Sequence, residues 1–152
     1  MKNLIPIVAG EPNSINSEII AKAWKNKKIK NIFIIGNYSI IKKQLFKMSI
    51  KIPIIKINKL EDVKNQKNLL IFDVPLKFKS AFEIEDAQVR DYIFKSLNLA
   101  HKMTIDKKIK GFINAPVDKK IFDNTCLGVT EYLSKKNMTK NKEVMMIYNK
   151  EL

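Results

Sequence analysis

The chain has 152 residues, of which 45% are hydrophobic and 29% charged, enough to bury a core and to exclude a disordered protein. Its formal net charge of +14 raises the question of nucleic-acid binding. Arg90 is, however, the only arginine among 29 basic residues, and the lysines are scattered without a dense block or an aromatic stacking motif, so we expect no nucleic-acid partner.

Five short apolar runs, rich in β-branched residues, predict strands. Several are apolar on both faces, which is typical of parallel strands covered by helices on both sides. The runs are "LIPIVA" (4–9), "NIFIIG" (31–36), "IPIIKI" (52–57), "NLLIFD" (68–73) and "KGFINAP" (110–116). A further strand-like run, "VMMIY" (144–148), comes close to the last residue given.

Helical spacing of apolar residues marks the segments between these runs. The first predicted helix has Ser14 as its N-cap and a buried stripe. That stripe contains Ile15, Ile19, Ile20, Ala23 and Trp24. A second helix is expected over 39–48, and a polar connection over 56–68 has room for a short one.

The longest helix is expected from Ile84 or Asp86 to Met103. Its buried stripe would contain Ala87, Tyr92, Ile93, Leu97 and Ala100. Three acidic residues (Glu83, Glu85 and Asp86) lie at its start, where the helix dipole favours negative charge; a carboxylate site is the alternative. Alternating strands and helices predict an α/β fold, a doubly wound, mostly parallel sheet flanked by helices, as one domain over 1–152.

Two residue types that often carry chemistry occur once each. Cys126 excludes an intrachain disulfide and has no evident activating base, so we expect a structural role. His101 follows Leu97 and Ala100 at helical spacing, which favours a helix flank. No apolar run approaches the roughly 20 residues that span a membrane, and the first residues do not resemble a secretory signal, so we expect a cytoplasmic protein.

Three loops follow predicted strands at the carboxyl edge of the sheet, where open α/β sheets bind ligands. They are 9–18, the residues after Asp73, and "NAPVDKK" (114–120). Glycine-rich nucleotide motifs are absent from the sequence, which has four glycines. Turn chemistry is the alternative explanation for Gly10, Pro12 and Asp73, and solvation for Lys119 and Lys120.

Taken in order, three motifs resemble the N-terminal half of the 4-hydroxythreonine-4-phosphate dehydrogenase family. "GEPNSINSEI" (10–19) resembles the family's G-[DE]-P-A-G-I-G-P-E, and "GFINAPVDKK" (111–120) resembles T-G-P-[IV]-x-K. "GVTEYL" (128–133), with "EVMMIYNKEL" after it, resembles G-H-T-E-[FY]-[FL] and the following methionine-containing strand. The resemblance implies an isocitrate/isopropylmalate dehydrogenase-like sheet, incomplete relative to the family.

The resemblance also implies which residues bind substrate. Lys119 matches the motif lysine and Thr130 a substrate-contacting threonine, whereas Val129 stands where the family has a substrate-contacting histidine. Valine offers neither charge nor a hydrogen bond. Asn13, Ser14, Asn16 and Ser17 replace Ala-Gly-Gly-Pro, and Asn114 and Ala115 replace Thr-Gly.

The family oxidises a phosphorylated hydroxy-amino acid with NAD in the route to pyridoxal phosphate. It therefore implies NAD and a divalent metal (Zn, Mg or Co), a phosphorylated small-molecule substrate and a homodimer. The family's three metal-binding histidines lie beyond the positions matched here, so this chain supplies no metal ligand and no catalytic residue. The leading hypothesis is that this chain is the N-terminal portion of such a dehydrogenase, either a fragment of a longer protein or a shortened relative. The alternatives are a non-catalytic α/β domain that binds a phosphorylated metabolite or a protein, and, more weakly, a lysine-driven polyanion binder.

Overall fold

The computed structural model describes residues 4–26, 32–63, 67–122, 128–139, 142–146 and 148–149. The chain forms two compact units, Met1–Val117 and Asp118–Leu152. The first holds the sheet and its covering helices, and the second holds a short helix and irregular segments.

The sheet of the first unit has five parallel strands in the order β3-β4-β2-β1-β5. Their bounds are β1 Ile5–Val8, β2 Ile32–Gly36, β3 Ile54–Ile57, β4 Leu69–Asp73 and β5 Ile113–Asn114. Each predicted run contains one of these strands, so those five predictions are confirmed. The fully buried Phe33, Ile34, Ile35 and Ile71 lie on the central strands, where burying apolar surface contributes most to stability.

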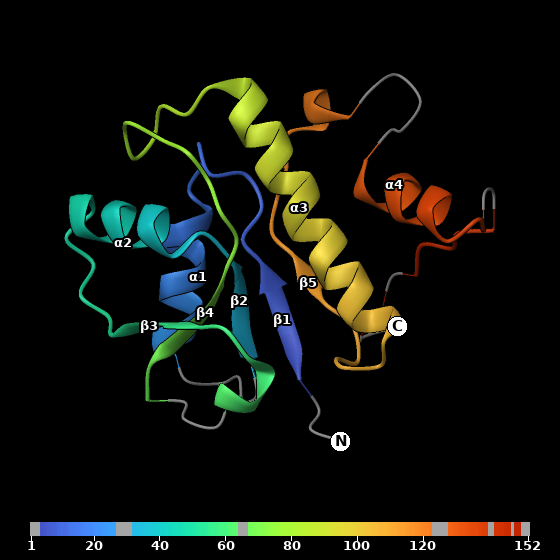
Figure 1. Cartoon of the computed structure of the whole chain (residues 1–152), viewed down its shortest axis with the longest axis horizontal. Helices are drawn as coiled ribbons and strands as arrows, with labels where there is room; N and C mark the ends of the chain where they lie inside the picture. The colour runs from blue at the N-terminus through green and yellow to red at the C-terminus, as the bar shows by residue number, and fades with distance from the viewer. Residues whose placement is uncertain are drawn as a thin grey trace. The chain divides into compact units, whose positions relative to one another are not determined.

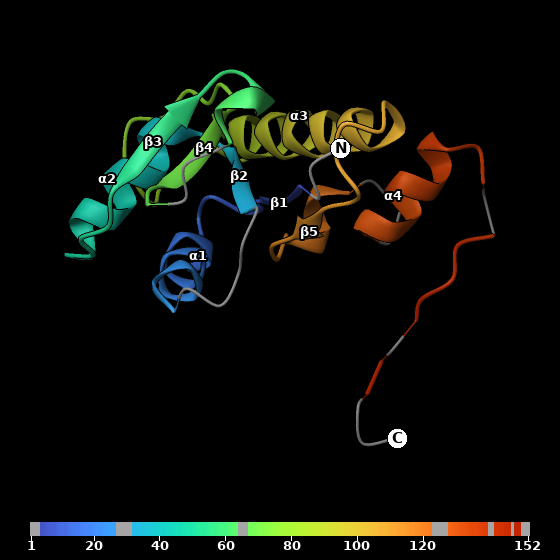
Figure 2. The ribbon, with the colours of Figure 1, turned by 90° about the horizontal axis from the view of Figure 1, so that it is seen from below.

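Helices cover both faces of this sheet (Figures 1 and 2). α1 (Asn16–Lys25) and α2 (Tyr38–Lys47) lie on one face, and α3 (Asp86–Ile105) lies on the other. The arrangement confirms the α/β prediction of a parallel sheet flanked by helices. Because every strand runs in the same direction, the loops after β1, β2, β4 and β5 meet at one edge.

α1 differs in detail from the prediction. Its N-cap is Ile15, without a side-chain cap; the Ser14 hydroxyl instead accepts the Asn16 N–H at 3.2 Å and donates to the Glu11 carbonyl at 2.6 Å. The stripe facing the sheet contains Asn16, Ser17, Ile20 and Ala21, whereas Ile15 and Ile19 are 64% and 48% exposed. Burying Ile15 and Ile19 was therefore a wrong prediction, because two polar residues take the inward positions.

α3 begins at Asp86, as predicted, and runs two residues past the predicted end to Ile105. Its buried stripe contains Val89, Tyr92, Ile93, Ser96, Leu97, Ala100 and Met103; Ala87 lies off this stripe and is exposed, contrary to prediction. His101 lies on α3 and is partly exposed. The polar connection before β4 holds a single 3-10 turn, η1 (Leu60–Asp62). Within the described ranges, no helix has both the length and the apolar character needed to cross a membrane.

The second unit contains a 3-10 turn, η2 (Lys119–Ile121), and the helix α4 (Val129–Lys136). The strand predicted over 144–148 is wrong over the described residues, because 144–146 and Tyr148 have no regular structure. Val144 and Met146 are 86% and 87% exposed. An isolated apolar run lacks the neighbouring strand that would satisfy its backbone groups. Ile147 and Cys126 lie outside the described residues.

Candidate functional site

The first turn of the chain meets the end of β5 at the carboxyl edge of the sheet. Gly10 has a φ of +69°, and a Cβ built on it would lie 2.5 Å from the Pro116 carbonyl oxygen. The Glu11 N–H donates to the same oxygen at 3.1 Å. Only glycine fits this backbone conformation and this close approach without strain. The structure thus brings the first two sequence motifs together.

Asn16 ties this turn in place. Its side-chain amide nitrogen lies 2.8 Å from the Pro116 carbonyl oxygen, 3.1 Å from that of Ala9 and 3.3 Å from that of Glu11. The residue is 3% exposed. A buried amide that satisfies several carbonyls fixes a loop more firmly than a flexible glycine would. Asn16 stands where the family motif has a small residue, and its side-chain amide forms these hydrogen bonds in that position.

Two more amides clamp the same loop to the segment that precedes α3. Asn13 forms a pair of hydrogen bonds with Ile84, donating to its carbonyl at 2.8 Å and accepting its N–H at 3.0 Å. Gln44 of α2, 2% exposed, donates to the carbonyls of Pro12 at 2.6 Å and Ala81 at 2.7 Å. Sequence reasoning missed these positioning residues. An isolated polar residue on an apolar helix stripe, such as Gln44, is the only local signal of such a role.

The loops after β2 and β4 are joined by a polar network. Asn37 donates to the Val74 carbonyl at 2.8 Å and accepts the Ile40 N–H at 2.9 Å, which caps α2. Asp73 accepts the Tyr38 N–H at 2.7 Å and pairs with Lys56 at 2.6 Å. The Asp73 carboxylate therefore supports the start of α2, where the helix dipole favours negative charge. The structure therefore favours a structural role for Asp73, which the sequence analysis gave as the alternative to ligand binding.

Tyr92 of α3 joins that polar network through its hydroxyl group. Its hydroxyl oxygen accepts the Asn37 backbone N–H at 3.1 Å. Burial raises the pKa of Tyr92 to about 12, and the charges of Asp73 and Glu11 act in the same direction. The hydrogen bonds from Asn37 and Ser96 oppose this rise in the pKa. Tyr92 is thus held neutral as a structural hydrogen-bond partner.

Two buried oxygens near this edge have no hydrogen-bond partner among the described residues. They are the side-chain oxygen of Asn114, at the end of β5, and the hydroxyl of Ser17, in the first turn of α1. A buried acceptor without a donor costs free energy that a bound hydroxyl or ammonium group could recover. Asn114 falls on the second sequence motif, in the Thr position of the family pattern.

The three predicted substrate-binding residues all lie in the second unit. Lys119 is exposed on η2, which Asp118 caps by accepting the Lys120 N–H at 2.9 Å. Val129, partly exposed, and Thr130, exposed, form the first turn of α4. The rings of Phe122 and Tyr132 pack with their centroids 6.0 Å apart, which joins the end of η2 to the start of α4.

The described residues do not fit a metal. They hold no group of three His, Cys, Asp or Glu side chains that could ligate one. His101 is the only histidine of the chain and lies on α3.

Comparison with protein families matches residues 28–152 to the family described as pyridoxal phosphate biosynthetic protein PdxA. The chain belongs to the PdxA family. The match covers the second and third motifs, and the fold places the first motif, which precedes the match, against the second. The family resemblance of the sequence is thereby confirmed. No curated protein matches the sequence.

Solved structures share the fold of this PdxA-family chain. A protein from Salmonella typhimurium, assigned as a 4-hydroxythreonine-4-phosphate dehydrogenase, is 17% identical with a TM-score of 0.75; the match covers 88% of this chain and 46% of that one. The 4-hydroxythreonine-4-phosphate dehydrogenase from Klebsiella pneumoniae is 16% identical with a TM-score of 0.70, over 88% and 45% of the two chains. That from Burkholderia phymatum is 15% identical with a TM-score of 0.64, over 80% and 38%. The chain thus spans less than half the length of these structures.

Proposed function

We propose that this chain supplies the N-terminal, substrate-binding portion of a dehydrogenase acting on 4-hydroxythreonine-4-phosphate or a related phosphorylated four-carbon hydroxy acid. The observation that carries the proposal is the PdxA family match over residues 28–152. The parallel sheet and its converging loops support it, because ligands of such sheets bind at the carboxyl edge. In this proposal 1–152 acts as one portion of a longer architecture.

Lys119 and Thr130 would hold the substrate. An exposed lysine ammonium attracts a phosphate as a point charge, and an exposed threonine hydroxyl both donates and accepts hydrogen bonds. Thr130 lies in the first turn of α4, whose N-cap, Gly128, makes no side-chain cap hydrogen bond. A helix start of this kind favours an anion. Val129 adds only apolar contact there, which weakens phosphate binding relative to the family's histidine.

We assign the redox chemistry to groups outside the described residues of this chain. In the family's reaction NAD accepts a hydride, and a divalent metal polarises the alcohol that is oxidised. Since the described residues do not fit a metal, we assign no catalytic step to them. We place NAD and metal binding in the portion of the architecture that this chain does not span. A cytoplasmic homodimer is part of the same proposal.

Titration of the purified chain with inorganic phosphate and with 4-hydroxythreonine-4-phosphate tests substrate binding. We expect Lys119→Ala and Thr130→Val each to weaken binding of the phosphorylated ligand about tenfold, which corresponds to losing one charge-assisted hydrogen bond. Lys120→Ala is the matched control, because Lys120 is the exposed neighbour of the motif lysine. Equal affinities for all four proteins would refute the site.

A non-catalytic binding domain is the second candidate, and Val129 favours it. The two functions differ in what the coding sequence downstream of Leu152 contains. A continuous frame with three well-placed histidines would support the dehydrogenase, and that longer protein should then reduce NAD with substrate and divalent metal. Phosphate binding without any turnover by the metal-loaded longer protein would support the binding domain instead.

A further inference from the structure

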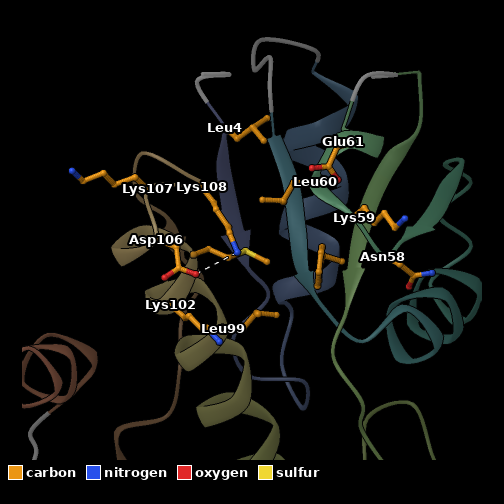
Figure 3. Close-up of a pocket in the computed structure, with 12 residues that line it drawn as sticks. Leu4, Asn58, Lys59, Leu60, Glu61, Leu99, Lys102, Asp106, Lys107 and Lys108 are labelled. Carbon is orange, nitrogen blue, oxygen red and sulfur yellow. Dashed lines mark ion pairs between the residues drawn. The ribbon is translucent and has the colours of Figure 1, made fainter.

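A large open groove lies on the α3 face of the sheet, within the first unit. Its volume is about 900 Å³, and it runs between the second half of α3 and η1 (Figure 3). Its apolar lining consists of Leu4, Leu60, Phe72, Leu99 and Met103. None of the residues assigned to substrate lines the groove, so an inference drawn from it does not depend on the proposed function.

One wall of the groove is a regular stripe of α3. Leu99, Lys102 and Met103 lie on it at helical positions i, i+3 and i+4, and Asp106, the C-cap of α3, follows at i+7. Residues at this spacing form one face of a helix, the face against which a second helix packs. Among the described residues of the first unit, two helices cover the opposite face of the sheet, whereas α3 alone covers this one. Ile55 of β3, the strand paired with β4, is 43% exposed.

The floor of the groove favours side-chain packing over strand addition. Phe72 belongs to β4, which is paired with β2 on one side and with β3 on the other. The backbone groups of β4 are therefore already used within the sheet, and an added strand would find no free edge there. An amphipathic helix needs no such edge, because it binds a groove through its apolar face.

The rim of the groove is basic. Lys59, Lys102, Lys107 and Lys108 line it together with two acidic residues, Glu61 and Asp106. Asp106 already pairs with Lys108 at 3.3 Å. The rim thus has an excess of positive charge around an apolar floor, and the complementary surface is apolar in its centre and acidic at its edges.

We propose that this groove is a docking site for an amphipathic protein helix that carries leucine-like residues on one face and carboxylates along its borders. The helix would lie beside α3 as the second helix on this face of the sheet. Its apolar residues would pack on Leu60, Phe72 and Leu99, and its carboxylates would meet Lys102 and Lys107. Met103, with its flexible side chain, would adapt to the residues that enter.

The probe is a fluorescein-labelled helix-forming peptide of about 14 residues, with leucines at i, i+3, i+4 and i+7, glutamates bordering the leucine face and alanines elsewhere. Fluorescence anisotropy measures its binding to the chain. We expect the double variant Lys102→Glu/Lys107→Glu to weaken binding at least about tenfold, and Leu60→Asn to weaken it several-fold. The matched controls are Lys47→Glu/Lys51→Glu, with the same change in net charge, and Phe46→Asn, at a residue 84% exposed on α2. Both controls should bind like the unaltered chain.

Three results would overturn the proposal. One is the absence of peptide binding to the unaltered chain. Another is an equal loss of affinity in the groove and control double variants, which would mean that net charge alone attracts the peptide. The third is equal binding of a scrambled peptide of the same composition. Circular dichroism of each variant checks that the fold is retained.

Discussion

The side-chain amide of Asn16 donates to the carbonyl oxygen of Pro116 at 2.8 Å, joining residues 100 positions apart in the sequence. One residue lies in the first turn of α1 and the other just after β5. This bond, with those to Ala9 and Glu11, sets the distance between two loops at the carboxyl edge. One buried amide thus helps to fix the geometry of that edge, together with the Glu11 N–H that donates to the same Pro116 oxygen.

Replacing Asn16 should destabilise the first unit. Asn16→Ala leaves the buried Ala9 carbonyl without this donor and breaks the link to Pro116, and we expect it to lower the free energy of unfolding by about 1–3 kcal/mol. Asn16→Asp should cost more at neutral pH, because a carboxylate would face carbonyl oxygens, and part of that loss should be recovered on acidification. Urea unfolding followed by circular dichroism measures both. Asn58→Ala, at an exposed asparagine, is the control; a loss there as large as in Asn16→Ala would contradict the assignment.

Gly10 should tolerate no side chain. Its φ of +69° and the Pro116 oxygen 2.5 Å from a built Cβ predict that Gly10→Ala costs about 2 kcal/mol or more, from backbone strain and displacement of the loop. Gly111→Ala is the matched control, because a Cβ there meets nothing within 4 Å. Thermal unfolding of both variants compares them directly. Equal melting temperatures would show that the turn yields without cost.

The sequence predicts the strands of this fold better than the faces of its helices. The apolar runs around Ile34 and Ile71 have a local cause, the preference of β-branched residues for buried strands. The inward face of α1 has no such local cause. Asn16 faces inward because it bonds to the Pro116 carbonyl, 100 residues away, and the periodicity of α1 cannot reveal that partner. The run at Val144 fails as a strand for a related reason: a strand requires a pairing partner, which its own sequence does not encode.

The candidate site is predictable to a similar extent. That the loops at Glu11 and Pro116 meet follows from parallel strands, whose carboxyl ends share one edge. The roles of Asn37 and Gln44 do not follow, since each depends on carbonyl groups of segments distant in sequence. Asp73 could be recognised as a polar residue ending a strand, but only the structure shows that it anchors Tyr38.

Asp73 should contribute mainly through the start of α2. Asp73→Ala removes both the acceptor for the Tyr38 N–H and the charge at the helix start, and should cost about 1–2 kcal/mol. Asp73→Asn retains an acceptor and should cost less. Lys56→Ala should cost least, within about 0.5 kcal/mol, because the Lys56 side chain is 49% exposed and such ion pairs are weak. Chemical unfolding of the three variants gives the order, and a larger loss for Lys56→Ala than for Asp73→Ala would reverse this account.

Val129 provides a test of the proposed phosphate site by gain of function. Val129→His introduces an imidazole at the first residue of α4. At pH 6 most of this imidazole is protonated, and its positive charge should tighten binding of inorganic phosphate several-fold. The gain should shrink at pH 8. Val129→Gln supplies hydrogen bonds without a titrating charge and should show no such pH dependence. Calorimetric titration distinguishes the two variants, and identical pH profiles would argue against phosphate at this turn.

Tyr92 predicts a loss of stability at alkaline pH. Its pKa rises from 10.0 in the unfolded chain to about 12 in the folded one, chiefly through burial. The folded state therefore retains a proton that the unfolded state releases, so the stabilisation is complete below pH 10 and is lost as the pH rises toward 12. The total loss should be roughly 3 kcal/mol.

Tyr92→Phe removes the titrating group and should cost about 1–2 kcal/mol at neutral pH, because the Asn37 N–H loses its acceptor. The difference in unfolding free energy between the two proteins should narrow between pH 10 and 12 and change sign near the upper end, whereas a difference independent of pH would show that Tyr92 is accessible to water.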